Sequence, residues 1–174
     1  MRSHKVITSP LGIFTLVAED SVLIAVEPSA PDPASPVASR YGLAADTGFE
    51  AAERQLDEYF DGRRCCFSLP ISQAGTPFQQ QVWDAVSAIP YGQTRSYKQL
   101  ALDLGDAAKA RGVGAALSRN ALNIVVPTHR VVGARGALTG YSGGVDAKRA
   151  LLELEAGPQT GALRQQCSGS GVPA

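Results

Sequence analysis

The stretch that organises this sequence is Val125-Val126-Pro127-Thr128-His129-Arg130-Val131-Val132. Its valines are typical of a buried strand, and its proline fixes the backbone just before a small hydroxyl side chain. His129, one of only two histidines in the chain, directly follows that side chain. Such a layout presents a nucleophile at the end of a strand with its proton partner beside it, yet Thr128 is a poor nucleophile.

The chain has the size and composition of a protein that folds unaided. Its 174 residues suffice for one ordinary domain or two small ones, and 44% of them are apolar. No stretch approaches the roughly 20 apolar residues of a membrane span, and the N-terminus lacks the pattern of a secretion signal. We therefore expect a monomer without membrane contact, located in the cytoplasm (bacterial cytosol and nucleoid) or, in a eukaryote, in the nucleus.

The few metal-binding residue types are not arranged as a metal site. The three cysteines are odd in number and two of them are adjacent, which fits neither a disulfide framework nor a metal knuckle. His4 and His129 lie far apart in the sequence. We interpret Cys65, Cys66 and Cys167 as ordinary thiols and expect neither metal nor cofactor.

The net charge of zero conceals an asymmetry between the two halves. Residues 1–75 carry six Lys and Arg against ten Asp and Glu, a net of −4, whereas residues 76–174 carry ten against six, a net of +4. The second half is therefore the more plausible face for a polyanion, although many solvated surfaces have similar charge.

The first half reads as a scaffold. Apolar runs at residues 5–9, 12–18 and 21–27 predict a small antiparallel meander, and the proline-rich residues 28–46 predict a loop. Helical spacing of apolar residues predicts a helix over 49–60, and residues 66–69 predict one further strand. Nothing in this half indicates chemistry.

The second half predicts short helices with clear starts. Thr76-Pro77 predicts the first, with apolar residues on one face up to Ile89. Ser96-Tyr97-Lys98-Gln99 has the capping-box pattern, and Asp106 is expected to cap a further helix through Leu117. Two short helices across a turn at Gly105 resemble a helix-turn-helix.

The second of these helices is composed almost entirely of alanine and glycine over residues 107–116. One interpretation is tight packing against a neighbouring element. The other is that small side chains let the backbone approach a nucleic-acid groove, with Arg111 as the only long side chain able to reach the base stack.

The remaining segments complete an α+β prediction. Asp146 is expected to cap a last helix that ends at Glu155, and residues 158–174 are expected to be a disordered tail. We predict an N-terminal antiparallel-sheet domain over 1–72 and a mainly helical DNA-binding domain over 73–157.

Several motifs together resemble the O6-alkylguanine-DNA alkyltransferase family, whose signature is Pro-Cys-His-Arg-Val. The resemblance covers essentially the whole chain, and threonine replaces the family's acceptor cysteine. The matching segments, in their order along the chain, are Tyr97, Arg111-Gly112-Val113-Gly114, Asn120, Pro127-Thr128-His129-Arg130-Val131-Val132, Tyr141-Ser142-Gly143-Gly144 and Glu155.

The resemblance implies recognition of O6-alkylguanine in double-stranded DNA by base flipping. Arg111 would fill the place of the extruded base, Tyr97 would crowd the 3′ phosphate and donate to N3, and Asn120 would support the turn before the strand. The carbonyls of Thr128 and Val131 would accept the guanine amino group. The loop formed by Tyr141, Ser142 and Gly143 would line the pocket.

The implied catalytic positions are Thr128, His129 and Glu155, the last two forming a relay that draws a proton from the acceptor. A thiol has a pKa near 8.5 and can be activated in this way, whereas a threonine hydroxyl is far less acidic. None of the three cysteines lies in the motif. The chain thus resembles the alkyltransferase-like proteins, which bind the lesion without repairing it and flag it for nucleotide excision repair proteins.

Two alternatives stay open at this point. Many alkyltransferase-like proteins lack the N-terminal domain that this chain keeps, and the alternative to a lesion-binding protein is a true O6-methylguanine-DNA methyltransferase in an altered, Cys-to-Thr form. A general helix-turn-helix regulator is the third interpretation, and it predicts no preference for alkylated DNA.

Overall fold

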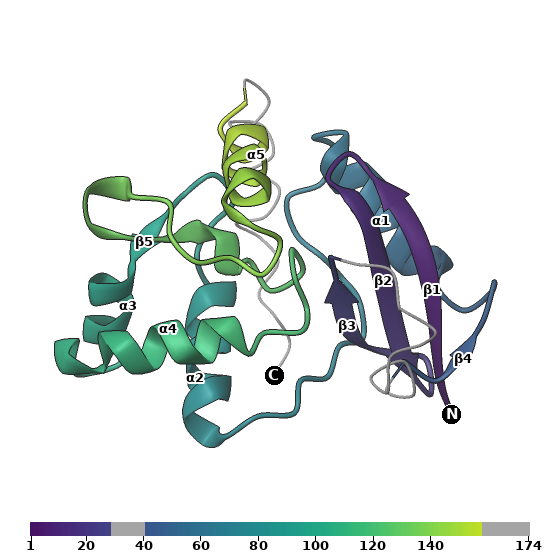
Figure 1. Ribbon diagram of the computed structural model, residues 1–174, viewed down its shortest axis with the longest axis horizontal. Coiled ribbons are helices and arrows are strands. Elements are labelled where there is room, and N and C mark those ends of the chain that lie inside the picture. Colours follow the sequence, from purple (N-terminus) through teal and green to yellow (C-terminus); the bar gives the residue numbers. More distant parts are fainter. Residues whose placement is uncertain (29–40, 158–174) are drawn as a thin grey trace.

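The computed structural model describes residues 1–28 and 41–157, and it has the predicted α+β class (Figure 1). An antiparallel-dominated sheet is followed along the chain by a helical domain. The predicted tail and most of the predicted proline-rich loop lie outside the described ranges. Within those ranges, no helix is long and apolar enough to cross a bilayer.

The N-terminal sheet has four strands in the order β3-β2-β1-β4. The predicted antiparallel meander is confirmed and consists of β1 (Arg2–Ser9), β2 (Gly12–Glu19) and β3 (Val22–Glu27). β4 (Leu43–Ala44) lies within the predicted loop and pairs in parallel with β1. Two residues are too short a pattern to be distinguished from a loop in the sequence.

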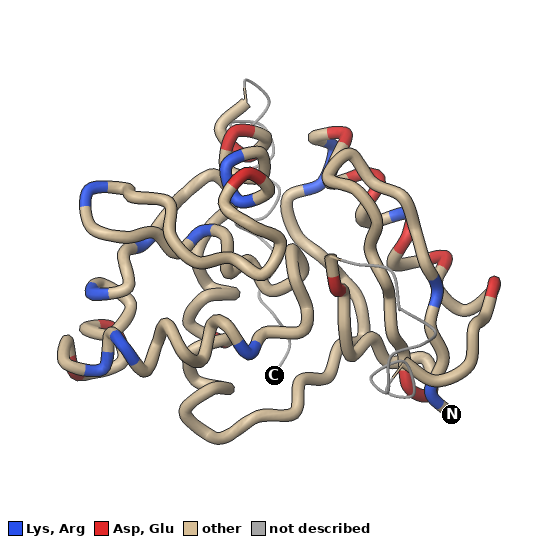
Figure 2. The backbone as a smooth tube through the Cα atoms, in the orientation of Figure 1, with Lys and Arg blue, Asp and Glu red and all other residues tan. Residues whose placement is uncertain are grey.

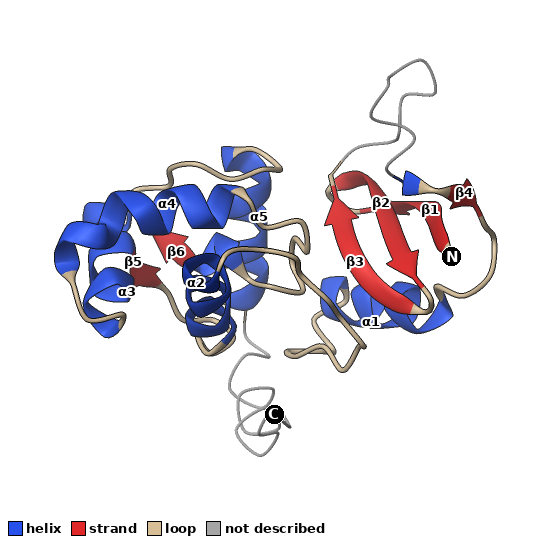
Figure 3. Cartoon of the chain, turned by 90° about the horizontal axis from the view of Figure 1, so that it is seen from below, coloured by secondary structure: helices blue, strands red, loops and turns tan. Residues whose placement is uncertain are grey.

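One helix covers a face of this sheet (Figure 3). α1 (Glu50–Phe60) matches the predicted helix and buries Ala52, Leu56 and Tyr59, which recur at helical spacing. Tyr59 is completely buried and thereby directs a polar hydroxyl into the interior of the protein.

The strand predicted at residues 66–69 is wrong. The Gln55 side chain exchanges two hydrogen bonds with the backbone of Ser68, at 3.0 and 2.8 Å, and so takes the main-chain groups that a strand would pair. The following residues reach the sheet instead. The Leu23 amide donates to the Pro70 carbonyl at 2.8 Å, and the Ser72 amide donates to the Leu23 carbonyl at 3.0 Å.

The helical domain begins with two helices whose starts were correctly predicted from local capping. α2 (Pro77–Ser87) follows Thr76, and α3 (Tyr97–Asp103) follows Ser96. Both have complete capping boxes, in which a hydroxyl accepts from the amide three residues on while that residue's side chain binds the cap amide.

The next two helices depart from the prediction in detail. A 3₁₀ turn at Ala107–Lys109, capped by Asp106, precedes α4 (Ala110–Ser118). α5 (Val145–Glu155) starts after Gly144, whose φ of +88° favours glycine. The predicted cap at Asp146 is therefore wrong, because this residue lies in the first turn and binds Arg149 instead.

The predicted buried strand over residues 125–132 is largely wrong. Only β6 (Val131–Val132) is a strand, and it pairs in parallel with β5 (Arg95–Ser96). A 3₁₀ turn at Thr128–Arg130 precedes it, and a second 3₁₀ turn at Ala134–Gly136 follows. Pro127 has no amide hydrogen to give to a strand, and Ile124 has a φ of +72°. The apolar run therefore marks burial and not strand pairing.

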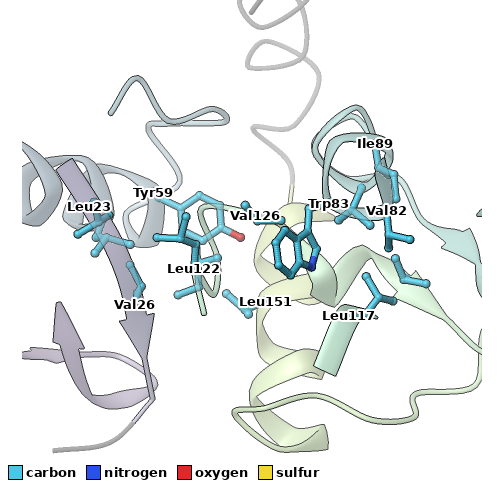
Figure 4. Close-up of a cluster of buried hydrophobic side chains, with 14 of the residues drawn as sticks. Leu23, Val26, Tyr59, Val82, Trp83, Ile89, Leu117, Leu122, Val126 and Leu151 are labelled. Atoms are coloured by element: carbon cyan, nitrogen blue, oxygen red, sulfur yellow. The ribbon is translucent and has the colours of Figure 1, made fainter. Parts of the chain in front are cut away.

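A single hydrophobic core joins the two halves (Figure 4). Leu23 and Val26 from the sheet, with Tyr59 from α1, belong to the same buried cluster as Trp83 of α2 and Leu151 of α5. The loop after α4 contributes further to the junction, because the Val26 amide donates to the Ala121 carbonyl at 2.8 Å. The helical domain is thus supported by the sheet domain from one side.

Candidate functional site

Thr128 lies at the wall of a cavity of about 310 Å³. The side chain is nearly buried, with 6% of its surface exposed, because the 3₁₀ turn places it beneath α4 and the glycine-rich loop. The residues that line this cavity are Tyr97, Gly114, Leu117, Ser118, Thr128, Gly140, Tyr141 and Ser142. The volume is at the lower end of the range for small-molecule pockets.

Four of the residues predicted for the base pocket meet in this cavity, and two do not. Tyr97, Thr128, Tyr141 and Ser142 line it, while Val131 is completely buried and Gly143 is half-buried outside it. The sequence interpretation missed the contribution of α4, which supplies residues 114, 117 and 118. Their recurrence at helical spacing is the signal that would have found them.

The Glu155 carboxylate is the most heavily bonded group behind Thr128. Oε1 accepts from the Tyr59 hydroxyl at 2.7 Å, from His129 Nε2 at 2.8 Å and from Arg130 Nη2 at 2.9 Å. Oε2 accepts from Arg130 Nε at 2.9 Å and from the Gly92 amide at 3.1 Å. Burial alone would raise the pKa of Glu155, but its bonds to His129 and Arg130 outweigh this and hold the pKa far below its usual range.

His129 is completely buried, and its two ring nitrogens differ in their surroundings. Nε2 donates to Glu155, whereas Nδ1 is buried and has no hydrogen-bond partner among the described residues. Burial lowers the pKa of His129 against the opposing attraction of the Glu155 carboxylate, so the ring is neutral at pH 7. The ring can therefore accept a proton at Nδ1.

The predicted His129–Glu155 pair thus forms, but sequence reasoning missed two of its partners. Arg130 is buried and also donates from Nη1 to the Ile89 carbonyl at 2.7 Å. Tyr59 comes from the other domain, 96 residues before Glu155. A lone tyrosine on the buried face of a helix carries no sequence signal of such a contact.

Tyr97 and Lys148 hold the same carbonyl at the edge of the cavity. The Tyr97 hydroxyl donates to the Thr139 carbonyl at 3.2 Å, and Lys148 Nζ donates to it at 2.8 Å. Lys148 also donates to the Val131 carbonyl at 2.6 Å. Burial lowers the pKa of Lys148 to about 8.

The glycine-rich loop is connected to the N-terminal sheet through one asparagine. The Ser142 hydroxyl donates to Asn123 Oδ1, and Asn123 Nδ2 donates to the Val26 carbonyl of β3 at 3.0 Å. Tyr141 packs edge-on against His129, with ring centroids 6.3 Å apart. Burial raises the pKa of Tyr141, and its hydroxyl has no partner among the described residues.

Asn120 is buried, and its contacts are those of a backbone support. Its Nδ2 donates to the Val126 carbonyl at 3.3 Å, and its Oδ1 accepts from the Leu122 amide at 3.0 Å and from Gln73 Nε2 at 2.6 Å. The side chain therefore shapes the loop that leads to Thr128.

The outer face of α4 carries one long side chain among small ones. Arg111 and Ala115 are exposed one turn apart on this helix. Figure 2 shows Lys and Arg distributed over this helical domain, with most of the Asp and Glu on the sheet domain. This face fits the interpretation that the backbone approaches a groove.

The glycines of α4 face neighbouring side chains of the same domain, as the packing interpretation predicts. A Cβ atom on Gly112 would lie 3.3 Å from the Phe78 ring, and one on Gly114 would lie 3.8 Å from the Tyr97 ring. The packing interpretation is thus confirmed for Gly112, and the approach of the outer face to a groove stays a prediction.

Neither of the described cysteines lies at the cavity. Cys65 is buried and disulfide-bonded, which departs from the expectation of an ordinary thiol, and Cys66 is free and exposed. Within residues 1–28 and 41–157, no group of three or more His, Cys, Asp or Glu side chains could hold a metal ion.

Both halves of the chain match one protein family. Residues 3–73 match the family described as "6-O-methylguanine DNA methyltransferase, ribonuclease-like domain", and residues 77–157 match its "DNA binding domain". A methylated-DNA–protein-cysteine methyltransferase of Mycobacterium tuberculosis is 43% identical over 166 residues, which cover 89% of this chain and 93% of the relative. A constitutive one from Bacillus subtilis is 53% identical over 105 residues, covering 60% and 64%.

Solved structures of the mycobacterial protein have the same fold. The crystal structure of the M. tuberculosis O6-methylguanine methyltransferase superimposes with a TM-score of 0.81 at 42% identity, covering 90% of this chain and 93% of that one. The M. tuberculosis OGT in complex with DNA gives a TM-score of 0.78 at 44% identity, covering 88% and 92%. This chain therefore belongs to the O6-methylguanine-DNA methyltransferase family of DNA repair proteins.

Proposed function

We propose that this protein binds duplex DNA, extrudes an O6-alkylguanine and holds it in the Thr128 cavity without transferring the alkyl group. One observation carries the proposal. A threonine lines the cavity at the position where the family signature has the acceptor cysteine, and Tyr97, Tyr141 and Ser142 line the cavity with it. The mycobacterial and Bacillus relatives are named for passing a methyl group to a protein cysteine.

The chemistry of Thr128 is the reason to separate binding from transfer. Alkyl transfer needs a nucleophile that attacks carbon, and a thiolate is suited to this because it forms near neutral pH. A threonine hydroxyl is much less acidic, and a neutral imidazole at His129 cannot remove its proton to a useful extent. Threonine nucleophiles typically use the amino terminus of their own chain as base, whereas Thr128 is internal.

The rest of the site is suited to holding an extruded base. Extrusion costs a few kcal/mol, which contacts in the pocket and in the vacated stack must offset. Arg111, exposed near the start of α4, would enter the stack. Tyr97 would assist rotation of the nucleotide, and the Thr128 carbonyl would accept the guanine amino group; the Val131 carbonyl lies outside the cavity lining and already accepts from Lys148 at 2.6 Å.

The bound complex would act as a signal and not as a repaired product. Nucleotide excision repair proteins are the partners that we propose for it, with the protein itself a monomer in the cytosol or, in a eukaryote, in the nucleus. The net positive charge of residues 76–174 supports contact with the phosphates of the DNA backbone.

The second candidate function is stoichiometric alkyl transfer by a form of this protein that carries cysteine at position 128. The observation that favours it is that His129 and Arg130 both donate to the Glu155 carboxylate. With cysteine at position 128, His129 held by Glu155 would accept the thiol proton and so generate a thiolate.

Label transfer separates the two functions. The protein is incubated with a duplex oligonucleotide carrying O6-methylguanine with a labelled methyl group. We expect no label on the protein and tighter binding of this duplex than of a matched guanine duplex. Stoichiometric labelling of the wild-type protein would contradict the binding function.

Two substitutions at the same position sharpen the result. Thr128→Cys should gain transfer, while Thr128→Ser, which keeps the hydroxyl and also removes the methyl group, should not. Equal affinity for both duplexes would instead support a general helix-turn-helix regulator. Fluorescence of 2-aminopurine beside the lesion reports extrusion, because an unstacked neighbour brightens this base.

A further inference from the structure

The N-terminal domain reaches the site through one side chain. Figure 4 shows the Tyr59 ring between Leu23 of the sheet and Val126, with its hydroxyl directed towards the helical domain. The hydroxyl lies 2.7 Å from Glu155 Oε1 and 3.4 Å from His129 Nε2, and all three side chains are completely buried.

We propose that Tyr59 is a positioning residue of this site: by donating to Glu155 Oε1, it holds His129 as a neutral imidazole with its proton on Nε2 and its lone pair on Nδ1. The inference rests on the proposed function only in treating the cavity beside His129 as the lesion pocket. It gives the sheet domain a defined task in that pocket.

The geometry around Glu155 Oε1 supports this role. Tyr59, His129 and Arg130 all donate to this one oxygen, within 2.7 to 2.9 Å. Each donor takes up part of the negative charge, so less of it is available to attract a second proton to the imidazole. The Tyr59 side chain is uncharged, so its hydroxyl can be removed by substitution without changing the charge of the site.

Other charged groups act on His129 in both directions. The Glu155 carboxylate favours an imidazolium, whereas the Arg130 guanidinium and the Lys148 ammonium disfavour it. Tyr141 faces the ring edge-on and is neutral, since burial raises its pKa. Tyr91, which packs against Tyr59 with centroids 6.1 Å apart, is neutral for the same reason.

Removing the Tyr59 hydroxyl should therefore shift the balance towards an imidazolium. More of the Glu155 charge would face Nε2, and the second proton would be easier to place on Nδ1. A phenylalanine keeps the ring contacts that Tyr59 makes with Phe60, Phe67 and Tyr91, so packing is largely preserved.

The test is a titration of the histidine rings by ¹H–¹⁵N NMR on the full-length protein without DNA. The chain has two histidines, so His4 serves as the second signal in each spectrum. In the wild type we expect His129 as the neutral Nε2–H tautomer at pH 7. In Tyr59→Phe we expect its titration midpoint to rise by about one pH unit.

A matched control is available in the same domain. The Tyr41 hydroxyl donates to Glu27 at 2.7 Å, so Tyr41→Phe removes an equivalent bond far from the cavity. It should leave the His129 titration unchanged. An unchanged His129 midpoint in Tyr59→Phe would overturn the proposal, and so would a wild-type His129 that is an imidazolium or an Nδ1–H tautomer at pH 7.

The last of these outcomes does not depend on whether the Tyr59→Phe variant folds. A second measurement uses the Thr128→Cys background, where the pH midpoint of alkyl transfer should move upward in Thr128→Cys/Tyr59→Phe. The NMR result requires no lesion binding, so a failure of the proposed function and a failure of this inference are distinguishable.

Discussion

Replacing Glu155 by glutamine tests whether this buried carboxylate stabilises the whole fold. The amide has nearly the size of the carboxylate, but it turns one acceptor oxygen into a donor. In one orientation its NH₂ group faces Arg130 Nε and the Gly92 amide, and in the other it faces Tyr59, His129 and Arg130 Nη2. In either orientation the glutamine NH₂ group faces donors that the carboxylate had accepted from. The buried Arg130 guanidinium also loses the negative charge that it pairs with.

The expected loss is large compared with the stability of a domain. Removing one partner of a buried ion pair typically costs about 3–5 kcal/mol. A total unfolding free energy is on the order of 5–15 kcal/mol, so the variant should fold but with a much reduced margin. For a chain of this size, that loss corresponds to a fall in the melting temperature of about 6–20 °C.

Urea denaturation followed by tryptophan fluorescence measures this loss, because Trp83 is the one tryptophan and is buried. Glu153→Gln on the same helix is the matched control, since Glu153 is exposed and should change stability by less than about 0.5 kcal/mol. A loss below about 1 kcal/mol for Glu155→Gln would refute the reasoning.

The pH dependence of the difference provides a second check. The pKa of Glu155 is lowered in the folded state, so its contribution is fully present above its unfolded pKa of about 4.3. As the pH falls below that value, Glu155 becomes protonated in the unfolded state while it stays ionised in the folded state. The stabilisation that Glu155 contributes therefore declines. The stability difference between wild type and Glu155→Gln should therefore be constant from about pH 8 to pH 5 and narrow below about pH 4.

Two further substitutions test the cavity edge and the DNA-binding face. The pKa of Lys148 is lowered to about 8, below its unfolded value of about 10.4, so the unfolded state binds more protons between these values and stability should rise with pH there. Lys148→Met should abolish that rise in urea midpoints measured from pH 7 to 10.5, and an unchanged rise would assign it to other groups. Arg111→Ala should reduce the preference for an O6-methylguanine duplex over a guanine duplex, whereas Lys109→Ala should weaken both equally. Equal weakening by Arg111→Ala in anisotropy titrations would assign it to phosphate contact alone.

The parts of the fold that sequence reasoning predicted well depend on neighbouring residues. The capping boxes at Thr76 and Ser96 fix the starts of α2 and α3 through contacts three residues apart. The strand predicted over residues 125–132 failed because an apolar run reports burial, and both a 3₁₀ turn and a strand can be buried. Pro127 inside the run was the available signal against it.

The same limit applies to the site. His129 and Glu155 were identified from a family resemblance, whereas Tyr59 and Lys148 were not identified at all. Tyr59 binds Glu155, 96 residues away, and Lys148 binds Val131, 17 residues away. No local sequence pattern indicates contacts over such separations. The cavity-lining positions of α4 are residues 114, 117 and 118, and only their helical spacing indicates that they share one side of the helix.

The shared Thr139 carbonyl has a consequence for how a base would be admitted. Tyr97 must release this oxygen before its hydroxyl can turn to an incoming nucleotide, while Lys148 keeps its own bond to the same oxygen. The loop therefore stays tethered when the tyrosine swings away, and the cost of freeing it is that of one ordinary hydrogen bond, about 1 kcal/mol. The Tyr97 hydroxyl could thus change its acceptor from the Thr139 carbonyl to an atom of the base while the loop keeps its position.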